Sequence, residues 1–123
     1  MPKTKLPELG ETELVLMKTL WRAESMSARE IHDDLPEALE WAYTTTRSTL
    51  DRMVAKGLVT KTAWHGLYLY RAAIARPEGL AGYIRRFAAR VLETEPSKVV
   101  SLFIEKESLS RDEIRRLRAL VED

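Results

Sequence analysis

The stretch YTTTRSTLDRMVAKG, residues 43–57, decides the fold of the first half of the chain. Its apolar residues recur at helical spacing, and its closing glycine suits the left-handed conformation that ends many helices. We therefore predict a helix over residues 43–56, capped by Gly57. At about 100° per residue, one side of this helix must face a core. That side holds Thr46, Leu50, Met53 and Val54.

The opposite side of the predicted helix is small, polar and cationic. It presents Thr44, Thr45, Ser48 and Arg52, flanked by Arg47, Thr49 and Lys56. Short hydroxyl side chains allow close approach to a duplex groove, and arginine binds guanine edges or phosphates bidentately. Three consecutive threonines are poor helix formers, so a face made of them indicates a contact surface. The competing interpretation is a face that is merely solvated.

Charge is segregated along the chain, although the formal net charge is only +1. Residues 43–71 carry five basic side chains and one acid, whereas residues 1–42 carry five basic side chains and nine acids. A localised basic block favours a polyanionic partner. Together with the threonine and arginine face, it predicts double-stranded DNA as that partner.

Two further helices and a hairpin are predicted around this segment. A helix begins at about Thr12, and Ser27 with Glu30 forms a capping box that opens a second, short helix ended by Pro36. The β-prone runs 58–62 and 67–71 flank Trp64-His65-Gly66 and predict a hairpin. Three helices followed by a hairpin are the order of a winged helix-turn-helix domain, mainly α with a small β-hairpin wing.

The recognition helix and the hairpin are expected to contact DNA together, with bases read by the first part of the helix. The expected DNA-binding residues are Tyr43, Thr44, Thr45, Arg47, Ser48, Thr49, Arg52, Lys56, Lys61, Thr62, Trp64 and His65.

A helical domain over residues 76–123 is predicted to follow the winged helix domain of residues 1–75. Arg76-Pro77-Glu78-Gly79 breaks the pattern, and three amphipathic helices follow it, the second opened by Pro96 and the third by a capping box at Ser110. So short a segment encloses little core by itself, so we expect a second subunit to cover its apolar faces. The alternative is that these helices fold back on the first domain. The expected dimerisation residues are Ile84, Phe87, Val91, Val99, Phe103, Ile114, Leu117 and Leu120.

The sequence lacks the motifs that are typical of several other classes of function. The chain has no cysteine, which excludes disulfides, thiolate catalysis and cysteine-based metal sites. It has no nucleophile elbow, glycine-rich phosphate loop or HExxH motif, so we expect neither an enzyme nor a cofactor. His32 lies beside Asp33 and Asp34, and we interpret these three residues as solvated surface rather than as a metal site. No apolar run approaches the roughly 20 residues of a membrane span, and no signal peptide pattern is present, which favours a cytoplasmic protein.

The chain resembles the BlaI/MecI penicillinase repressor family over residues 9–121. The matching stretches are ELVLM (13–17), LW (20–21), Trp41, RMVAKG (52–57), YLY (68–70) and LSRDEI (109–114). The resemblance implies a homodimeric winged-helix repressor that binds an inverted-repeat operator and controls β-lactamase or related resistance genes. It also implies a membrane sensor-protease as a partner, which triggers cleavage of the repressor in its dimerisation domain.

Three positions depart from the family pattern. The cleavage-sensitive Asn-Phe pair of the family corresponds to Leu102-Phe103 here, and the third helix begins Tyr43-Thr44-Thr45 in place of a Pro-Lys-Thr type, which implies a different operator. The wing tip Trp64-His65-Gly66 carries less charge than in relatives. The rival interpretation is a winged-helix protein-interaction adaptor without direct DNA binding, which salt dependence distinguishes because an apolar interface responds little to salt.

Overall fold

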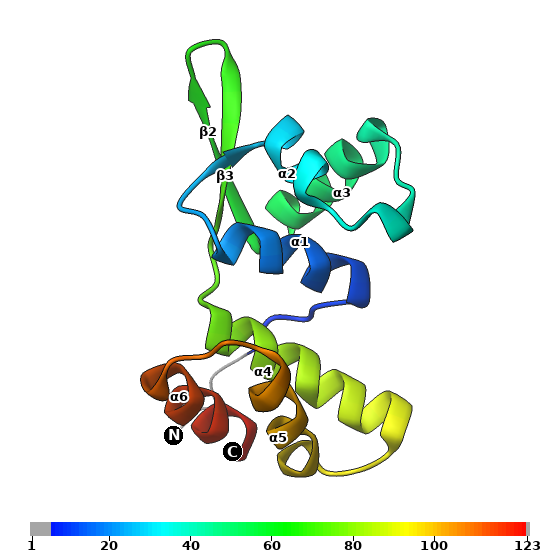
Figure 1. Cartoon of the computed structure of the whole chain (residues 1–123), viewed down its shortest axis with the longest axis vertical. Helices are drawn as coiled ribbons and strands as arrows, with labels where there is room; N and C mark the ends of the chain where they lie inside the picture. Colours follow the sequence, from blue (N-terminus) through cyan, green and yellow to red (C-terminus); the bar gives the residue numbers. More distant parts are fainter. Residues whose placement is uncertain (1–5, 123) are drawn as a thin grey trace. The chain divides into compact units, whose positions relative to one another are not determined.

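The computed structural model describes residues 6–122, which form two compact units (Figure 1). The first, the winged unit, is Glu11–Ala75, and the second, the helical unit, consists of residues 6–10 and 76–122. The sequence-based division placed residues 1–75 together, whereas the structure groups residues 6–10 with the helical unit. Residues 1–5 and 123 lie outside the described residues.

The winged unit contains three helices and a three-stranded antiparallel sheet. The helices are α1 (Glu11–Trp21), α2 (Ala28–Asp34) and α3 (Tyr43–Ala55), and a 3-10 turn, η1 (Glu37–Leu39), lies between α2 and α3. The strands are β1 (Met26–Ser27), β2 (Val59–Trp64) and β3 (Leu67–Ala72), in the order β1-β3-β2. The predicted winged helix fold, mainly α with a small wing, is confirmed (Figure 1).

Ser27 joins the sheet to α2. Its hydroxyl accepts a hydrogen bond from the Glu30 N–H at 3.2 Å, and the Glu30 carboxylate accepts one from the Ser27 N–H at 2.9 Å. This is the predicted capping box. Ser27 also pairs with Leu69 of β3. Sequence analysis predicted no strand here, because two residues are too few to show an alternating pattern.

α3 ends, as predicted, at a left-handed glycine. Gly57 has a φ of +80°, its N–H donates to the Val54 carbonyl at 3.0 Å, and the Leu58 N–H donates to the Met53 carbonyl at 3.0 Å. These two bonds satisfy carbonyls at the end of the helix and turn the chain towards β2.

The wing is the hairpin of β2 and β3. Its turn is His65-Gly66, and both residues have positive φ values, +44° and +82°, as the tightest hairpin turns require. Trp64, which the sequence placed in the loop, is instead the last residue of β2 and pairs with Leu67.

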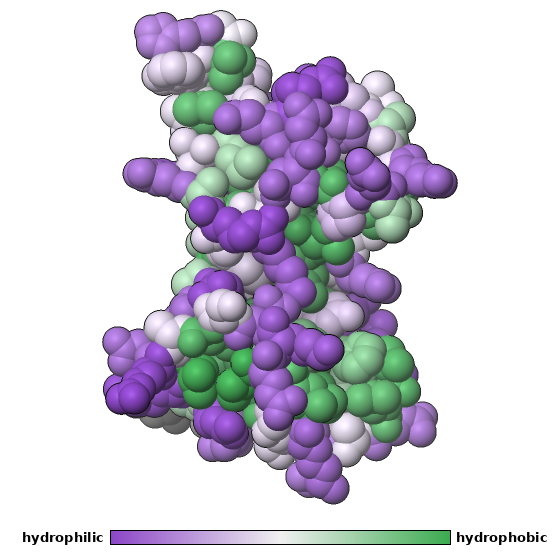
Figure 2. Space-filling model, in the orientation of Figure 1, coloured by the Kyte–Doolittle hydropathy of each residue, from purple (hydrophilic) through white to green (hydrophobic). Residues whose placement is uncertain are grey.

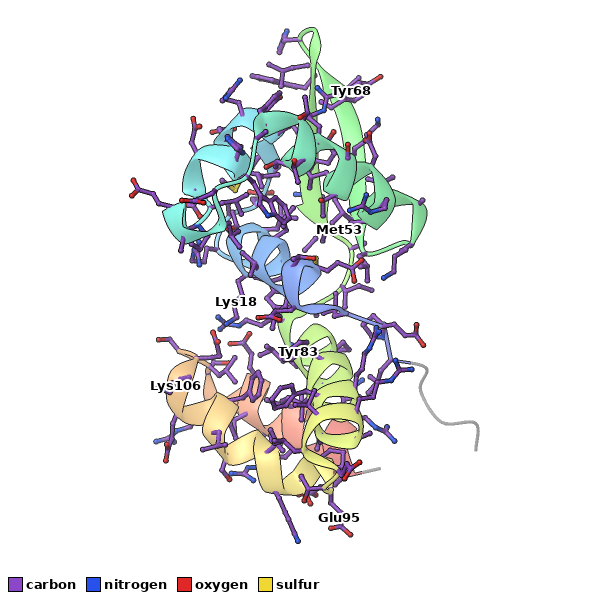
Figure 3. All side chains as sticks on the ribbon, turned by 90° about the vertical axis from the view of Figure 1, so that its right-hand side faces the viewer. Lys18, Met53, Tyr68, Tyr83, Glu95 and Lys106 are labelled. Carbon is purple, nitrogen blue, oxygen red and sulfur yellow. The ribbon has the colours of Figure 1, made fainter. Side chains whose placement is uncertain are left out.

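The core of the winged unit is formed by all three helices and the sheet. Met53 points from α3 into this interior (Figure 3). The Trp21 ring nitrogen donates to the Ile74 carbonyl at 2.8 Å, so the last turn of α1 also fixes the chain after β3. The buried apolar residues are Leu14, Leu16, Met17, Leu20, Ala28, Ile31, Leu50, Met53, Leu58, Val59 and Tyr70.

The helical unit consists of α4 (Arg76–Phe87), a π-helical turn η2 (Ala88–Leu92), α5 (Pro96–Lys106) and α6 (Arg111–Glu122). The predicted openings of α5 at Pro96 and of α6 at the Ser110 capping box are both present. The C-terminal part of the helical unit begins at Arg76, where the sequence placed a break, but Arg76–Gly79 is itself helical. This stretch is the first turn of α4. Pro77 is tolerated there because a backbone N–H in the first turn of a helix has no hydrogen-bond partner within the helix.

The helical unit contains buried side chains of its own. Four of the eight side chains expected at a dimer interface, Ile84, Val99, Leu117 and Leu120, are at most 4% exposed within one chain. The expectation that they await a partner subunit is therefore wrong, because α6 packs along α4 and α5 and covers them. Phe87, Phe103 and Ile114 are partly exposed, and Val91 is 63% exposed.

A two-pronged ion pair ties the first turn of α4 to α6. Arg76 Nε donates to Glu113 Oε2 at 2.9 Å and Arg76 Nη2 donates to Oε1 at 2.6 Å, while Nη2 also donates to the Ser108 carbonyl at 3.0 Å. The hydrogen bonds from Arg76 lower the pKa of Glu113 to about 2. Within residues 6–122, no helix has the length and apolarity needed to cross a membrane.

Candidate nucleic-acid interface

Five side chains form the exposed face of α3, which we call the α3 face. They are Thr44, Thr45, Arg47, Ser48 and Arg52, and all are exposed to solvent. The opposite side of the helix is buried at Thr46, Leu50 and Met53, so core packing fixes the rotation of α3. Asp51 is the one acid within α3. The α3 face therefore combines short hydroxyl groups with two guanidinium groups on a rigid element.

Side chains of α2 hold the first turn of α3. The guanidinium of Arg29 lies 4.0 Å from the ring centroid of Tyr43, and the His32 ring meets that ring edge-on at 5.6 Å. Tyr43 is only partly exposed as a result, and a hydrogen bond with it raises the pKa of Arg47. Arg29 is an exposed cation that sequence analysis missed, because it lies on another helix and reaches Tyr43 only through the fold.

His32 positions α3 and is not simply solvated surface. A hydrogen bond of 2.7 Å joins His32 Nδ1 to Thr46 Oγ1. Thr46 is fully buried, so this bond satisfies its hydroxyl and links α3 to α2. The interpretation of His32 as an exposed residue is therefore wrong, whereas Asp33 and Asp34 are exposed as expected.

Thr49 does not belong to the α3 face. It is 3% exposed, and its hydroxyl donates to the Thr45 carbonyl at 2.8 Å. Arg52 Nη2 in turn donates to Thr49 Oγ1 at 3.3 Å. Thr49 is therefore a buried hydrogen-bond acceptor for Arg52, and its burial corrects its expected role as a direct DNA contact.

Lys56 is paired with α1. Its ammonium donates to both carboxylate oxygens of Glu13, at 2.9 and 2.8 Å, and its side chain is 43% exposed. Glu13 therefore neutralises the positive charge through which Lys56 was expected to contact a phosphate. Lys56 therefore joins the end of α3 to α1 through an ion pair and adds little to the positive potential of the α3 face.

The wing presents different chemistry on its two sides. Successive residues of a strand point to opposite faces, so Lys61 shares a face with Tyr68, while Thr62 and Trp64 lie on the other. The Lys61 ammonium is 4.4 Å from the centroid of the Tyr68 ring, and the rings of Trp64 and His65 meet edge-on at 4.3 Å. Figure 3 shows Tyr68 on the wing, away from the buried end of the hairpin.

Two exposed wing side chains escaped sequence analysis. Leu67 and Tyr68 are 43% and 47% exposed, comparable with Trp64 at 54%. Their apolar character suggested core positions, and only the pairing of β3 with β2 beyond the core reveals that they are accessible.

A second exposed surface lies on the helical unit. Val91, Leu92 and Leu102 are 63%, 49% and 59% exposed, and we call them the apolar patch. Figure 2 shows hydrophobic side chains gathered where η2 ends α4. Tyr83 contacts the Phe87 and Phe103 rings at centroid distances of 5.8 and 5.9 Å.

The bond between Leu102 and Phe103, which the family resemblance predicts as the counterpart of a cleavage position, lies inside α5. Its backbone is in helical hydrogen bonding, so a protease must first open this helix locally. Leu102 is exposed, but Phe103 is partly buried against Tyr83.

Comparisons with known proteins give a consistent result. The sequence model for "Penicillinase repressor" matches residues 9–123. The penicillinase repressor of Bacillus licheniformis is 24% identical over 97% of this chain and 93% of its own length. The methicillin resistance regulatory protein MecI of Mammaliicoccus sciuri is 25% identical over 95% of each chain.

Two BlaI proteins are also similar. The transcriptional regulator BlaI of Mycobacterium tuberculosis is 32% identical over 93% of this chain and 83% of its own length. A solution structure of the DNA-binding domain of the repressor BlaI aligns with a TM-score of 0.53 at 25% identity, covering 63% of this chain and 93% of that one. The match over residues 9–123 and the winged helix fold agree, and the chain belongs to the penicillinase repressor family.

Proposed function

We propose that this protein is a sequence-specific DNA-binding transcriptional repressor that acts as a homodimer on an inverted-repeat operator. The observation that carries the proposal is the α3 face, where two arginines and three hydroxyl side chains are exposed on one side of a helix that the core holds in place. Family membership supports it, because relatives are named repressors and a similar solved domain is described as DNA-binding.

The α3 face lies in the major groove of the operator. Arg47 and Arg52 bind guanine edges or flanking phosphates, and Thr44, Thr45 and Ser48 allow the helix to approach the base pairs closely. Arg29 binds phosphate beside the first turn of α3. The wing, with Lys61 and Thr62 and the exposed Trp64 and His65, lies along the adjacent backbone.

Two copies bind together through the apolar patch. Val91, Leu92 and Leu102 are large apolar side chains whose exposure in a single chain costs free energy that a second subunit recovers. Joining two weak half-site binders raises operator affinity, because the second binding event becomes intramolecular. The proposed target genes are those of β-lactamase or of another resistance or stress response, and the names of two relatives, penicillinase repressor and methicillin resistance regulatory protein, support a role in β-lactam resistance.

The DNA-binding claim is tested by selecting duplexes from a random pool with the purified chain. We expect enrichment of an inverted repeat whose half-sites are about one helical turn apart or a multiple of it. Arg47→Ala and Arg52→Ala should each weaken binding to the selected duplex by roughly 5- to 150-fold, which corresponds to about 1–3 kcal/mol. Arg22→Ala is the matched control, since Arg22 is exposed in the same unit but pairs with Asp34.

The salt dependence of duplex binding and the Arg22→Ala control distinguish the possible results of this experiment. Affinity should fall steeply as salt rises, with a logarithmic slope of about −0.9 for each phosphate contact. An enriched duplex bound equally well by all three arginine variants would show that the α3 face is not the contact surface. Failure to enrich any duplex, together with salt-insensitive binding to another polypeptide, would instead support an adaptor.

The dimer claim is tested by sedimentation. Val91→Asp should produce a monomer that keeps its far-ultraviolet circular dichroism, because it adds a charge to an exposed position and leaves the core intact. The control is Ala23→Asp, which adds the same charge at an exposed position of the winged unit. A dimer that survives Val91→Asp would place the subunit interface elsewhere.

A further inference from the structure

Three arginines converge on a cleft in the helical unit. The cleft has a volume of about 350 Å³ and is lined by residues 6–8 on one side and by Gly82, Arg85, Arg86 and Arg90 on the other. We call it the arginine cleft. Its volume lies within the range of small-molecule binding sites in proteins.

These arginines have no partner among residues 6–122. Arg85, Arg86 and Arg90 take part in no ion pair or hydrogen bond with another described side chain, whereas Arg76 and Arg116 of the same unit pair with Glu113 and Glu78. Three guanidinium groups brought together repel one another unless an anion lies between them. Among the described residues of the lining, Glu8 is the one carboxylate, so these residues together carry a surplus of two positive charges.

The opposite wall of the cleft is built by a close backbone approach. A Cβ atom at Gly82 would lie 2.2 Å from the Pro7 carbonyl oxygen, so the chain at Pro7 can lie against α4 only because residue 82 is glycine. Leu6 and Pro7 are partly exposed and provide an apolar wall facing the guanidinium groups. The arginines therefore line a shaped cleft rather than a flat, solvated helix face.

Guanidinium groups bind phosphate oxygens bidentately, and a site with two surplus positive charges suits a dianion. The apolar wall favours a ligand with a carbon framework attached to the phosphate. We propose that the arginine cleft binds a small phosphorylated organic molecule. Arg85 and Arg86 of α4 bind the phosphate together with Arg90 of η2, and Leu6 and Pro7 pack on the organic part.

Calorimetric titration of the full chain tests the proposal, with phenyl phosphate, inorganic phosphate and succinate as probes at an ionic strength held constant with NaCl. We expect phenyl phosphate to bind one equivalent per chain, more tightly than inorganic phosphate, and succinate to bind least. Arg85→Gln and Arg86→Gln should each weaken phenyl phosphate binding at least about tenfold, because each loses a hydrogen bond to a charged group. Arg118→Gln, an exposed arginine of α6 outside the cleft, is the matched control and should leave binding unchanged.

The results that would contradict this proposal can be told apart from one another. If all three arginine variants weaken phenyl phosphate binding equally, the effect comes from the net charge of the protein and not from the arginine cleft. If succinate binds as tightly as phenyl phosphate, the ligand is not specifically a phosphate. No saturable binding of any probe would overturn the site. Unchanged phosphate binding combined with lost duplex affinity in Arg85→Gln and Arg86→Gln would show that these arginines contact DNA instead.

Discussion

Replacing Glu113 with glutamine should destabilise the helical unit in a way that depends on pH. The Glu113 carboxylate accepts two hydrogen bonds from Arg76 and one from the Ser110 N–H, so it ties α4 to the capped start of α6. Glutamine keeps the shape of the side chain but carries no charge, and therefore resembles the protonated carboxyl. The substitution removes the electrostatic part of this arrangement with little change in packing.

The size of the effect follows from the pKa. The Arg76 hydrogen bonds lower the pKa of Glu113 from 4.5 to about 2, and a shift of one pKa unit corresponds to about 1.4 kcal/mol, which gives an upper bound of about 3 kcal/mol. The two side chains are 26% and 27% exposed, so solvent screening lowers the expected loss to about 1–2 kcal/mol. A carboxyl with a depressed pKa stabilises the fold above pH 4.5, and this stabilisation is lost as pH falls towards 2.

Urea unfolding of the unchanged protein and of Glu113→Gln measures this difference in the free energy of unfolding. All three tryptophans, Trp21, Trp41 and Trp64, lie in the winged unit, so their fluorescence follows that unit while far-ultraviolet circular dichroism follows both. At pH 7 the dichroism midpoint of Glu113→Gln should be lower than that of the unchanged chain, and the gap should narrow as pH falls below 4.5. Glu105→Gln, at an exposed position of α5, is the control and should match the unchanged chain. Equal midpoints for the two glutamine variants at pH 7, or a gap that persists at low pH, would refute the reasoning.

Three other substitutions have defined outcomes. Gly57→Ala places a Cβ at a φ of +80° and should lower the free energy of unfolding of the winged unit by about 1–2 kcal/mol, visible in tryptophan fluorescence. Ser27→Ala removes the hydroxyl that caps α2 and should lower the free energy of unfolding of the winged unit by about 1 kcal/mol in the same measurement. An unchanged unfolding midpoint would show that the cap does not contribute to stability. Leu117→Asp buries a charge and should abolish the helical dichroism of the helical unit while tryptophan fluorescence still reports a folded winged unit, in contrast to Val91→Asp.

The features that sequence analysis predicted are those that depend on near neighbours. The capping boxes at Ser27 and Ser110 and the left-handed Gly57 each involve hydrogen bonds within a few residues, so their chemistry is readable from the chain. The helical spacing of Leu50 and Met53 likewise fixed the buried side of α3. These local signals were enough to give the order of elements and hence the winged helix fold.

The errors arose where distant residues decide the outcome. Thr49 was expected outside because it is polar, but the surrounding fold leaves it only 3% exposed, and its hydroxyl is satisfied locally by the Thr45 carbonyl. β1 exists only because Met26 pairs with Tyr70 far along the chain. Leu117 was assigned to a subunit interface, since nothing local reveals that α6 packs against α4.

The close approach of Pro7 to Gly82 has a consequence for biosynthesis. The winged unit, Glu11–Ala75, is contiguous and can fold as soon as its own residues leave the ribosome, whereas the helical unit needs residues from both sides of it. The segment around Pro7 therefore emerges early and must wait for α4 to be translated before it gains its packing partner. A nascent chain whose residues up to Ala75 have all left the ribosome should already contain a complete winged helix, but residues 6–10 would still lack the helix against which they pack.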